Sequence, residues 1–400
     1  MWQFCVRCVA VIVLSCMFVG CGSISTQPTG SSPPSTNQPQ NTNTLVAANF
    51  PGADCGAKIL AADAAADANA TIEVTTACGT TWSTQVVVGA SHTLLIENGT
   101  YQIARTVRLH DGACVVGQDA VLAITTSTDI ISNADTSNSN LCVKTIGLSG
   151  AQLKGGRSRG IYFKNVQGFT ISGVDLEAMM THGVFIDDGS DNGQIVNNTC
   201  NGVIQGSCFL AGNSPGLAVA TNLNISNNTI SKARGNGVFV LGVKNGQPTS
   251  HVTINNNVIR CVHDTSIEIG DGAQFVSASG NQITPCEAGT TGIGVRSAQH
   301  IVVEDNTGSP SPPAANMIGI FVWNNKGDSQ PFADVTINHN TMSGFSGLTS
   351  SGISWSSFAA NSSNLSITNN TATGNTNNFF ARTNNIINLV FTGNSDAGFE

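Results

Sequence analysis

Residues 225–230 read Ile-Ser-Asn-Asn-Thr-Ile, and the pattern returns at residues 254–259 as Ile-Asn-Asn-Asn-Val-Ile. In eight consecutive periods of 24 to 34 residues, an asparagine stands three residues after an anchor that is mostly Ile or Val. These asparagines are Asn198, Asn228, Asn257, Asn281, Asn306, Asn340, Asn370 and Asn394. A motif that returns at such intervals indicates one structural unit per period, with each unit stacked on the next.

Each period also carries a second short run in which apolar residues alternate with other residues, as at residues 183–186, 237–240 and 319–322. Alternation over four to six residues, bounded by Asn, Gly and Thr, is typical of strands rather than helices. Several short strands per period, with no helical pattern between them, predict an all-β solenoid.

The recurring asparagine has a structural explanation. A tight bend between two sheets favours a residue that tolerates a left-handed backbone, and Asn tolerates it best after Gly. Stacked copies can also pass amide hydrogen bonds from one unit to the next. We therefore interpret the eight asparagines as part of the fold and not as ligand donors.

From about residue 50 to residue 399, this repeat pattern resembles the right-handed parallel β-helix of the pectate-lyase-like superfamily. The resemblance implies a single-stranded solenoid in which every coil adds one strand to each of three parallel sheets. Counting nine anchors and three looser copies, we expect about 12 coils in a domain covering residues 49–400.

A cap is expected at the N-terminal end, because the end of a solenoid exposes its apolar core. The Ala-rich residues 57–68 predict a short helix that fills this role. The predicted solenoid domain, residues 49–400, contains eight cysteines, and this even number suggests disulfides. Pairing them in sequence order predicts Cys55–Cys78, Cys114–Cys142, Cys200–Cys208 and Cys261–Cys286.

The N-terminus carries a targeting segment. Residues 9–19 are apolar, and the run ends in Phe-Val-Gly-Cys at residues 18–21, which resembles the lipobox of bacterial lipoprotein signals. The resemblance implies a signal peptide at residues 1–20, a lipid on Cys21, and export to the bacterial cell envelope. The Ser-, Thr-, Pro- and Asn-rich residues 21–48 then read as a disordered linker. An ordinary secretory signal is the alternative.

Composition excludes several partners. Charged residues make up 10% of the chain, the net charge is -8, and the sequence has no run of Lys or Arg. Nucleic acid and anionic membrane surfaces are therefore not expected partners, and membrane contact is expected only through the lipid anchor.

Aligning the second strands predicts which side chains point outward, beside a strip of Gly and Ser. The outward rows contain four Phe residues and a Trp, with a His and an Asp in the same strands: Phe185, Phe209, Phe239, Phe321, Trp323, His182 and Asp187. We expect longer loops at residues 212–222, 242–250, 324–333 and 357–363 to wall this strip. One interpretation is a cleft whose rings bind a polysaccharide or cell-surface glycan. In the other, loops or a second subunit cover the rings.

Glu268 interrupts the predicted Phe row, with Asp264 in the same coil and Arg296 one coil further. Glycan cleavage uses either two carboxylates or a base that faces a cation. We therefore take Glu268 and Asp264 as candidate acid/base residues, and Arg296 as the candidate for a substrate carboxylate. A structural Glu–Arg pair at the surface is the alternative.

The sequence indicates no cofactor. Only Asp187, Asp188 and Asp191 form a weak candidate calcium site, and an acidic turn is the favoured explanation of them. The order of Thr181-His182-Gly183 before Asp187-Asp188 differs from the polygalacturonase pattern. Function therefore stays open between a lyase or glycoside hydrolase acting on an acidic glycan and a non-catalytic adhesion or structural solenoid that uses its Phe face.

Overall fold

The computed structural model describes residues 43–150, 159–213, 219–325, 330–358, 362–382 and 386–396. The predicted signal peptide, the lipidation site Cys21 and most of the linker at residues 21–48 lie outside these ranges. Among the described residues, no helix is long and apolar enough to cross a membrane.

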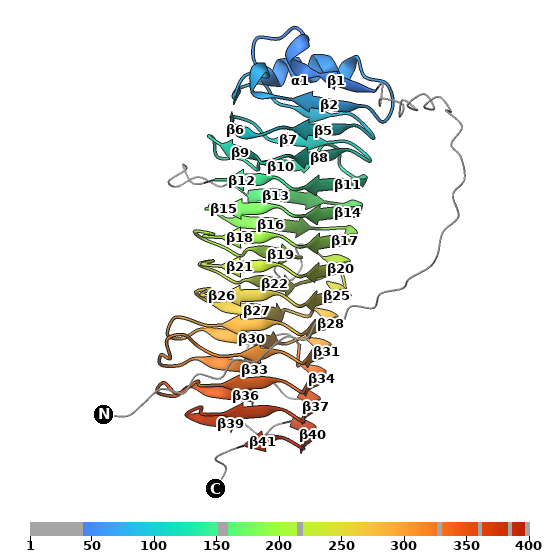
Figure 1. Cartoon of the computed structure of the whole chain (residues 1–400). Helices are drawn as coiled ribbons and strands as arrows, with labels where there is room; N and C mark the ends of the chain where they lie inside the picture. The colour runs from blue at the N-terminus through green and yellow to red at the C-terminus, as the bar shows by residue number, and fades with distance from the viewer. Residues whose placement is uncertain are drawn as a thin grey trace, which may run out of the picture. The chain divides into compact units, whose positions relative to one another are not determined.

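Three long parallel sheets run side by side along the stack of coils (Figure 1). The first has 14 strands. In order they are β1 (Thr44–Val46), β2 (Thr71–Val74), β5 (Thr93–Ile96), β8 (Cys114–Gly117), β11 (Asn138–Lys144), β14 (Val166–Ser172), β17 (Ser190–Val196), β20 (Ala220–Ser226), β25 (Ser250–Asn255), β28 (Gln274–Ser279), β31 (Gln299–Glu304), β34 (Ala333–Asn338), β37 (Ser362–Thr368) and β40 (Ile386–Thr392). β1 lies within the predicted linker, so the folded unit begins before residue 49.

The second sheet has 12 strands and carries the candidate site. They are β4 (Val87–Val88), β7 (Val107–Leu109), β10 (Ile131–Asn133), β13 (Arg159–Lys164), β16 (His182–Asp187), β19 (Phe209–Ala211), β22 (Val238–Leu241), β27 (Thr265–Gly270), β30 (Thr291–Arg296), β33 (Ile318–Asn324), β36 (Ser351–Ser357) and β39 (Asn377–Ala381). A small antiparallel hairpin, β23 (Val243–Lys244) and β24 (Gln247–Pro248), follows β22.

The third sheet has 13 strands. They are β3 (Thr81–Trp82), β6 (Gly99–Ile103), β9 (Ala120–Ile124), β12 (Gly147–Ser149), β15 (Asp175–Glu177), β18 (Thr199–Asn201), β21 (Thr229–Ser231), β26 (Val258–Arg260), β29 (Gln282–Thr284), β32 (Thr307–Gly308), β35 (Thr341–Ser343), β38 (Thr371–Thr373) and β41 (Ser395–Asp396). The all-β parallel solenoid predicted from the repeats is therefore confirmed, with 12 to 14 strands per sheet.

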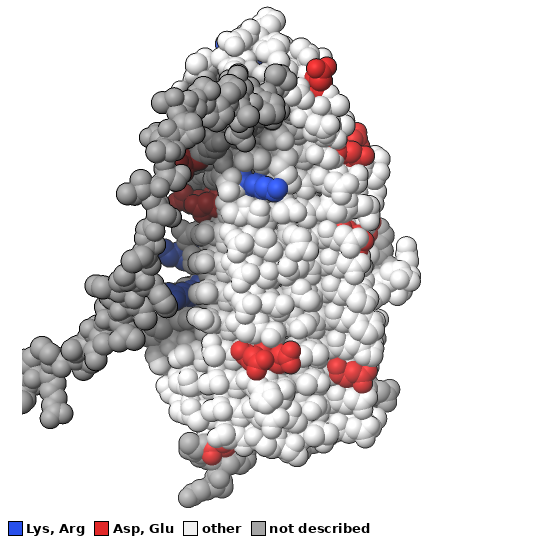
Figure 2. Space-filling model, turned by 45° about the vertical axis from the view of Figure 1, so that its right-hand side comes forward, with Lys and Arg blue, Asp and Glu red and all other residues white. Residues whose placement is uncertain are grey.

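The core is built from ladders of identical positions. In the 12-stranded sheet, Val238, Ile267, Ile293, Ile320 and Ile353 align in successive strands, and all are 0% exposed. Neighbouring strands lie about 4.8 Å apart, so each side chain packs on its counterparts above and below. Burying one such side chain stabilises the fold by about 1.5–3 kcal/mol. Few charged side chains interrupt the face shown in Figure 2.

The asparagine ladder is buried and continuous. Asn257 donates from its backbone N–H and from Nδ2 to Oδ1 of Asn281, both at 2.9 Å, and from Nδ2 to the Ile225 carbonyl at 3.0 Å. The stacking of amide groups is therefore confirmed. The left-handed backbone, however, belongs to the preceding residue, such as Asn227 or Asn256. The sequence interpretation misplaced the bend by one residue.

The N-terminal end is capped by α1 (Cys55–Ala64), which Figure 1 shows at the end of the stack, and α1 is preceded by the 3-10 turn η1 (Ala47–Asn49). Asp54 accepts hydrogen bonds from the N–H groups of Ala57 at 2.8 Å and Thr84 at 2.8 Å, so it joins the helix to the first coils. Burial alone would raise the pKa of this carboxyl, but hydrogen bonds from Ser83, Ala57 and Thr84 hold it well below its usual range. The predicted cap is therefore present, and its helix begins two residues earlier and ends four residues earlier than expected.

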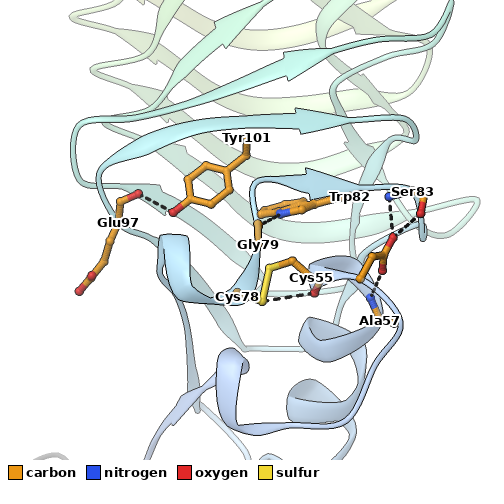
Figure 3. The surroundings of a disulfide bond; sticks show 9 residues. Cys55, Ala57, Cys78, Gly79, Trp82, Ser83, Glu97 and Tyr101 are labelled. Carbon is orange, nitrogen blue, oxygen red and sulfur yellow. Dashed lines mark hydrogen bonds between the residues drawn. A yellow bond between two sulfur atoms is a disulfide. The ribbon is translucent and has the colours of Figure 1, made fainter.

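All four predicted disulfides are present. Cys55–Cys78 ties α1 to the 3-10 turn η2 (Thr76–Cys78), as Figure 3 shows. The other three are Cys114–Cys142, Cys200–Cys208 and Cys261–Cys286. Because disulfides persist in oxidising compartments, they indicate an extracytoplasmic protein.

Candidate functional site

One row of outward side chains runs along the 12-stranded sheet, and strand register defines it. From β13 to β39 the aligned residues are Tyr162, Phe185, Leu210, Phe239, Glu268, Gly294, Phe321, Ser354 and Phe380. We call this set the outward row. It contains the predicted Phe185, Phe239, Glu268 and Phe321, but Leu210 stands where Phe209 was predicted.

Phe209 is not in the outward row. It pairs with Val184 and Val238, and it is 0% exposed in the core. The sequence alignment was one residue out here, because Cys208 must occupy a position from which it can reach Cys200. Leu210 therefore takes the outward position that was assigned to Phe209.

The predicted strip of Gly and Ser is not an outer surface either. Its members, including Gly237 and Gly292, are buried. A Cβ on Gly292 would lie 2.4 Å from the carbonyl oxygen of Gly319. These glycines allow adjacent coils to approach each other, and they do not form the floor of a cleft.

The first four residues of the outward row belong to an apolar cluster. Phe185, Leu210 and Leu241 are 6%, 7% and 3% exposed, and Tyr162 and Phe239 pack against them while remaining half-buried. The Phe row is therefore largely covered here. Two separate clefts lie on either side of this cluster along the same sheet.

The first cleft, which we call the C-terminal cleft, has a volume of about 480 Å³ and brings together Asp264, Glu268 and Arg296. Oε1 of Glu268 lies 3.7 Å from Nη1 of Arg296, and Nδ2 of Asn236 donates to Oε2 of Glu268 at 3.1 Å. Nη2 of Arg296 donates to Oδ1 of Asp271 at 2.6 Å. The structure therefore brings the three predicted catalytic residues into one cleft, with two supporting residues that sequence reasoning did not assign.

Glu268 is 6% exposed, so its ionised form is poorly solvated. Burial raises the pKa of this carboxyl to about 7, although Arg296 acts in the opposite direction and Asp264 adds to the rise. A carboxyl that titrates near neutrality can both accept and return a proton, as acid–base catalysis requires. Asp264 itself is exposed at the mouth of the cleft.

The far wall of the C-terminal cleft is aromatic. The rings of Phe321 and Trp323 are stacked, with centroids 4.6 Å apart and planes inclined by 11°. A Cβ on Gly294 would lie 2.9 Å from the Trp323 ring, so the glycine leaves room for the indole beside Arg296. The guanidinium carbon of Arg382 lies 5.0 Å from the Phe321 ring centroid, which makes a cation–π contact.

Arg382 was not identified from the sequence. It lies 86 residues after Arg296, in the coil of β39, and carries no motif. Register alone places it in the cleft, because Arg296 aligns with Trp323, Trp323 aligns with Ser356, and the residue after Ala381 continues this row.

The second cleft region, which we call the N-terminal cleft, consists of three adjoining hollows of about 430, 510 and 580 Å³ over strands β4 to β16. His182 and Phe185 line its inner end. Tyr162 donates to Oδ2 of Asp187 at 2.5 Å, and the Arg159 guanidinium lies 3.6 Å from the Tyr162 ring centroid. The predicted binding residue His182 therefore lines this cleft and not that of Glu268, while Asp187 is hydrogen-bonded to Tyr162, which lines the same cleft.

Two side chains of the N-terminal cleft, His182 and Tyr162, have shifted pKa values. Burial and the nearby Arg159 lower the pKa of His182 to about 4, so its ring is neutral and Nδ1 accepts from the Ser207 N–H at 3.2 Å. Burial and the hydrogen bond to Asp187 raise the pKa of Tyr162. Arg159 is held by Asp129 through two hydrogen bonds of 2.6 and 2.9 Å. These groups are suited to binding more than to proton transfer.

The weak calcium site at Asp187, Asp188 and Asp191 has no support from the geometry. Asp187 accepts from Tyr162, while Asp191 accepts from Thr221 at 2.5 Å and from Asn222 at 2.7 Å. Within the described ranges, no group of three or more His, Cys, Asp or Glu side chains is arranged to hold a metal ion.

Comparison with known proteins agrees with this architecture. A family model described as a right handed beta helix region matches residues 82–249. No curated protein sequence matches the chain.

Solved structures share the fold at low sequence identity. A double mutant of the periplasmic alginate epimerase AlgG is similar over 82% of this chain and 73% of its own, with a TM-score of 0.53 and 12% identity. The A-module of the Azotobacter vinelandii mannuronan C-5 epimerase AlgE6 is similar over 89% and 100%, with a TM-score of 0.56 and 13% identity. The catalytic domain of a GH87 alpha-1,3-glucanase in complex with nigerose is similar over 91% and 70%, with a TM-score of 0.58 and 12% identity. The protein is a right-handed parallel β-helix protein.

Proposed function

We propose that the C-terminal cleft binds an acidic polysaccharide and cleaves it, with Glu268 as the group that transfers the proton. The observation that carries the proposal is a buried carboxyl with a pKa of about 7, placed 3.7 Å from Arg296 and in the same cleft as the stacked Phe321 and Trp323 rings. Aromatic faces pack against sugar rings, while arginine forms bidentate hydrogen bonds with carboxylates.

The arrangement favours elimination on a uronic-acid polymer. Arg296 binds the substrate carboxylate and stabilises the negative charge that develops on it. Ionised Glu268 takes the proton from the carbon next to that carboxylate. The electrons of the broken C–H bond form a carbon–carbon double bond as the glycosidic C–O bond breaks, and the departing oxygen takes up a proton. Hydrolysis is the second outcome of the same site, with Glu268 as acid and Asp264 as base.

Purified protein incubated with polygalacturonate and alginate distinguishes these outcomes. Elimination creates unsaturated ends that absorb ultraviolet light, whereas hydrolysis creates reducing ends without that absorbance. We expect Glu268→Gln to lower turnover by about 100-fold or more, because the variant cannot accept the proton. Glu304→Gln, a matched change on β31 of another sheet, is the control. Full activity in the Glu268→Gln variant would contradict the proposal.

The alternative of an adhesion or structural solenoid requires an accessible Phe face. Phe185 is 6% exposed and Phe209 is 0% exposed, so two of the four predicted Phe side chains are unavailable for contact with another protein. The geometry therefore favours glycan processing over this alternative.

We also propose that the protein is exported and anchored through a lipid on Cys21, on the basis of its lipobox-like sequence. The four disulfides support export from the cytoplasm. In a bacterial host, Cys21→Ser is expected to release the protein from the membrane fraction. Equal membrane retention of the variant would contradict the anchor.

A further inference from the structure

We propose that the N-terminal cleft is a second, non-catalytic binding site for the same anionic polysaccharide, and that it holds a part of the chain remote from Glu268. The inference rests on the proposed function, because it assigns both clefts to one polymer. It concerns residues that the cleavage chemistry does not use: Arg105, Arg108 and Lys164.

The first observation is unpaired positive charge. Arg105, Arg108 and Lys164 are exposed and line this cleft. Among the described residues, none of the three makes an ion pair, whereas Arg159 in the same cleft is paired with Asp129. In a chain of net charge -8, free cations gathered in one cleft indicate an anionic ligand.

The second observation is the polar lining around these cations. Oγ1 of Thr106 and Oγ1 of Thr128 lie 2.7 Å apart, and Ser132 lies in the same hollow. Neutral His182, at the inner end, offers a ring N–H donor from Nε2 because Nδ1 accepts the Ser207 N–H. Hydroxyl groups and single N–H donors match the hydroxyl groups of sugars.

The N-terminal cleft also lies in line with the C-terminal cleft along the 12-stranded sheet. Arg108 continues the outward row beyond Tyr162, because it aligns with Ser132 and Ser132 aligns with Tyr162. Six strand spacings separate Arg108 from Glu268, which is about 29 Å at about 4.8 Å per spacing. An extended polysaccharide lying along the sheet can therefore reach both clefts. A chain bound at two sites gains affinity without any new contact at either one.

Binding to oligomers of different length tests the inference. In the Glu268→Gln background, which prevents consumption of the ligand, we would measure the affinity for uronate oligomers that span both clefts and for oligomers too short to do so. The expected ratio of long-chain to short-chain affinity is well above one. The double change Arg108→Ala and Lys164→Ala is expected to lower long-chain affinity about tenfold and to bring the ratio towards one.

The control removes the same charge elsewhere. Lys144→Ala with Arg260→Ala changes two exposed cations on the other two sheets, and the affinity ratio should stay at its original value. Equal affinity for long and short oligomers, or an Arg108/Lys164 variant that behaves like the control, would overturn the second site and leave the proposed activity standing. Absence of both binding and turnover with every uronate polymer would overturn both.

Discussion

The buried asparagine ladder and the outward row of the 12-stranded sheet cross the same coils under opposite constraints. From Asn198 to Asn370 the ladder keeps one residue type and one set of hydrogen bonds in every coil. Over the same coils, the outward row changes from Phe185 to Glu268 to Gly294.

The difference has a physical cause. A side chain that hydrogen-bonds to its own copy must be the same in each coil, because a single change leaves buried polar groups unpaired on two neighbours. An outward side chain has no such partner and is free to vary. Regularity in a solenoid therefore marks structure, whereas local departures from the repeat mark the places where function can reside.

The largest expected loss of stability tests the alignment that puts Phe209 in the core and Leu210 in the outward row. Phe209→Ala should destabilise the fold by about 3–5 kcal/mol, because it empties a position in the core. Leu210→Ala, one residue further in the small outer cluster, should cost about 2–3 kcal/mol, at the lower end of the range for a buried leucine. Urea unfolding of both variants compares them directly. A larger loss for Leu210→Ala would return Phe209 to the outward row.

Breaking the ladder should cost slightly less. Asn257→Ala removes the side-chain donor to Ile225 and Asn281, together with the acceptor used by Asn228. We expect a loss of about 2–4 kcal/mol, since buried partners are left unpaired. Asn224→Ala, a half-buried asparagine on β20 whose side chain lies outside the ladder, serves as the control in thermal unfolding. If both changes lower the stability by the same amount, the ladder does not stabilise the fold more than other asparagines do.

Glu268 in the outward row should make the stability of the fold depend on pH, whereas the asparagines of the ladder do not titrate. Its pKa is raised from 4.5 to about 7, so the folded state binds a proton that the unfolded state releases. This contribution to stability is complete below pH 4.5 and is lost as pH rises through about 7. Elimination needs ionised Glu268, so activity should rise over the same range. Glu268→Gln should remove this fall in stability, and an unchanged stability profile in that variant would refute the shift.

The smallest effect is expected at the aromatic wall. Trp323→Ala should weaken binding of uronate oligomers about tenfold, through loss of ring stacking on the sugar. Phe275→Ala is the matched control, because Phe275 is also aromatic and 48% exposed but lies on the 14-stranded sheet between His251 and His300. Titration calorimetry compares the two variants. Equal losses would mean that the contact with ligand is not specific to the cleft.

Sequence periodicity was sufficient for much of the candidate site. Aligning the coils on their asparagines placed Glu268, Arg296 and Phe321 on one face, and the structure brings Asp264, Glu268 and Arg296 into one cleft. The same alignment failed at Phe209, because a coil closed by Cys200–Cys208 does not keep the spacing of its neighbours. The alignment also assigned all outward side chains of the second strands to one site, whereas an apolar cluster divides them between two clefts.

By itself, the sequence determined the parallel solenoid, its N-terminal cap and its four disulfides, because each depends on patterns that repeat along the chain or on a simple pairing order. Only the tertiary structure decided which side chains share a cleft. Arg382 reaches the Phe321 ring across two coils, and Tyr162 reaches Asp187 across one. Such contacts join different coils. The length and bends of each coil decide which side chains meet, and no sequence motif indicates them.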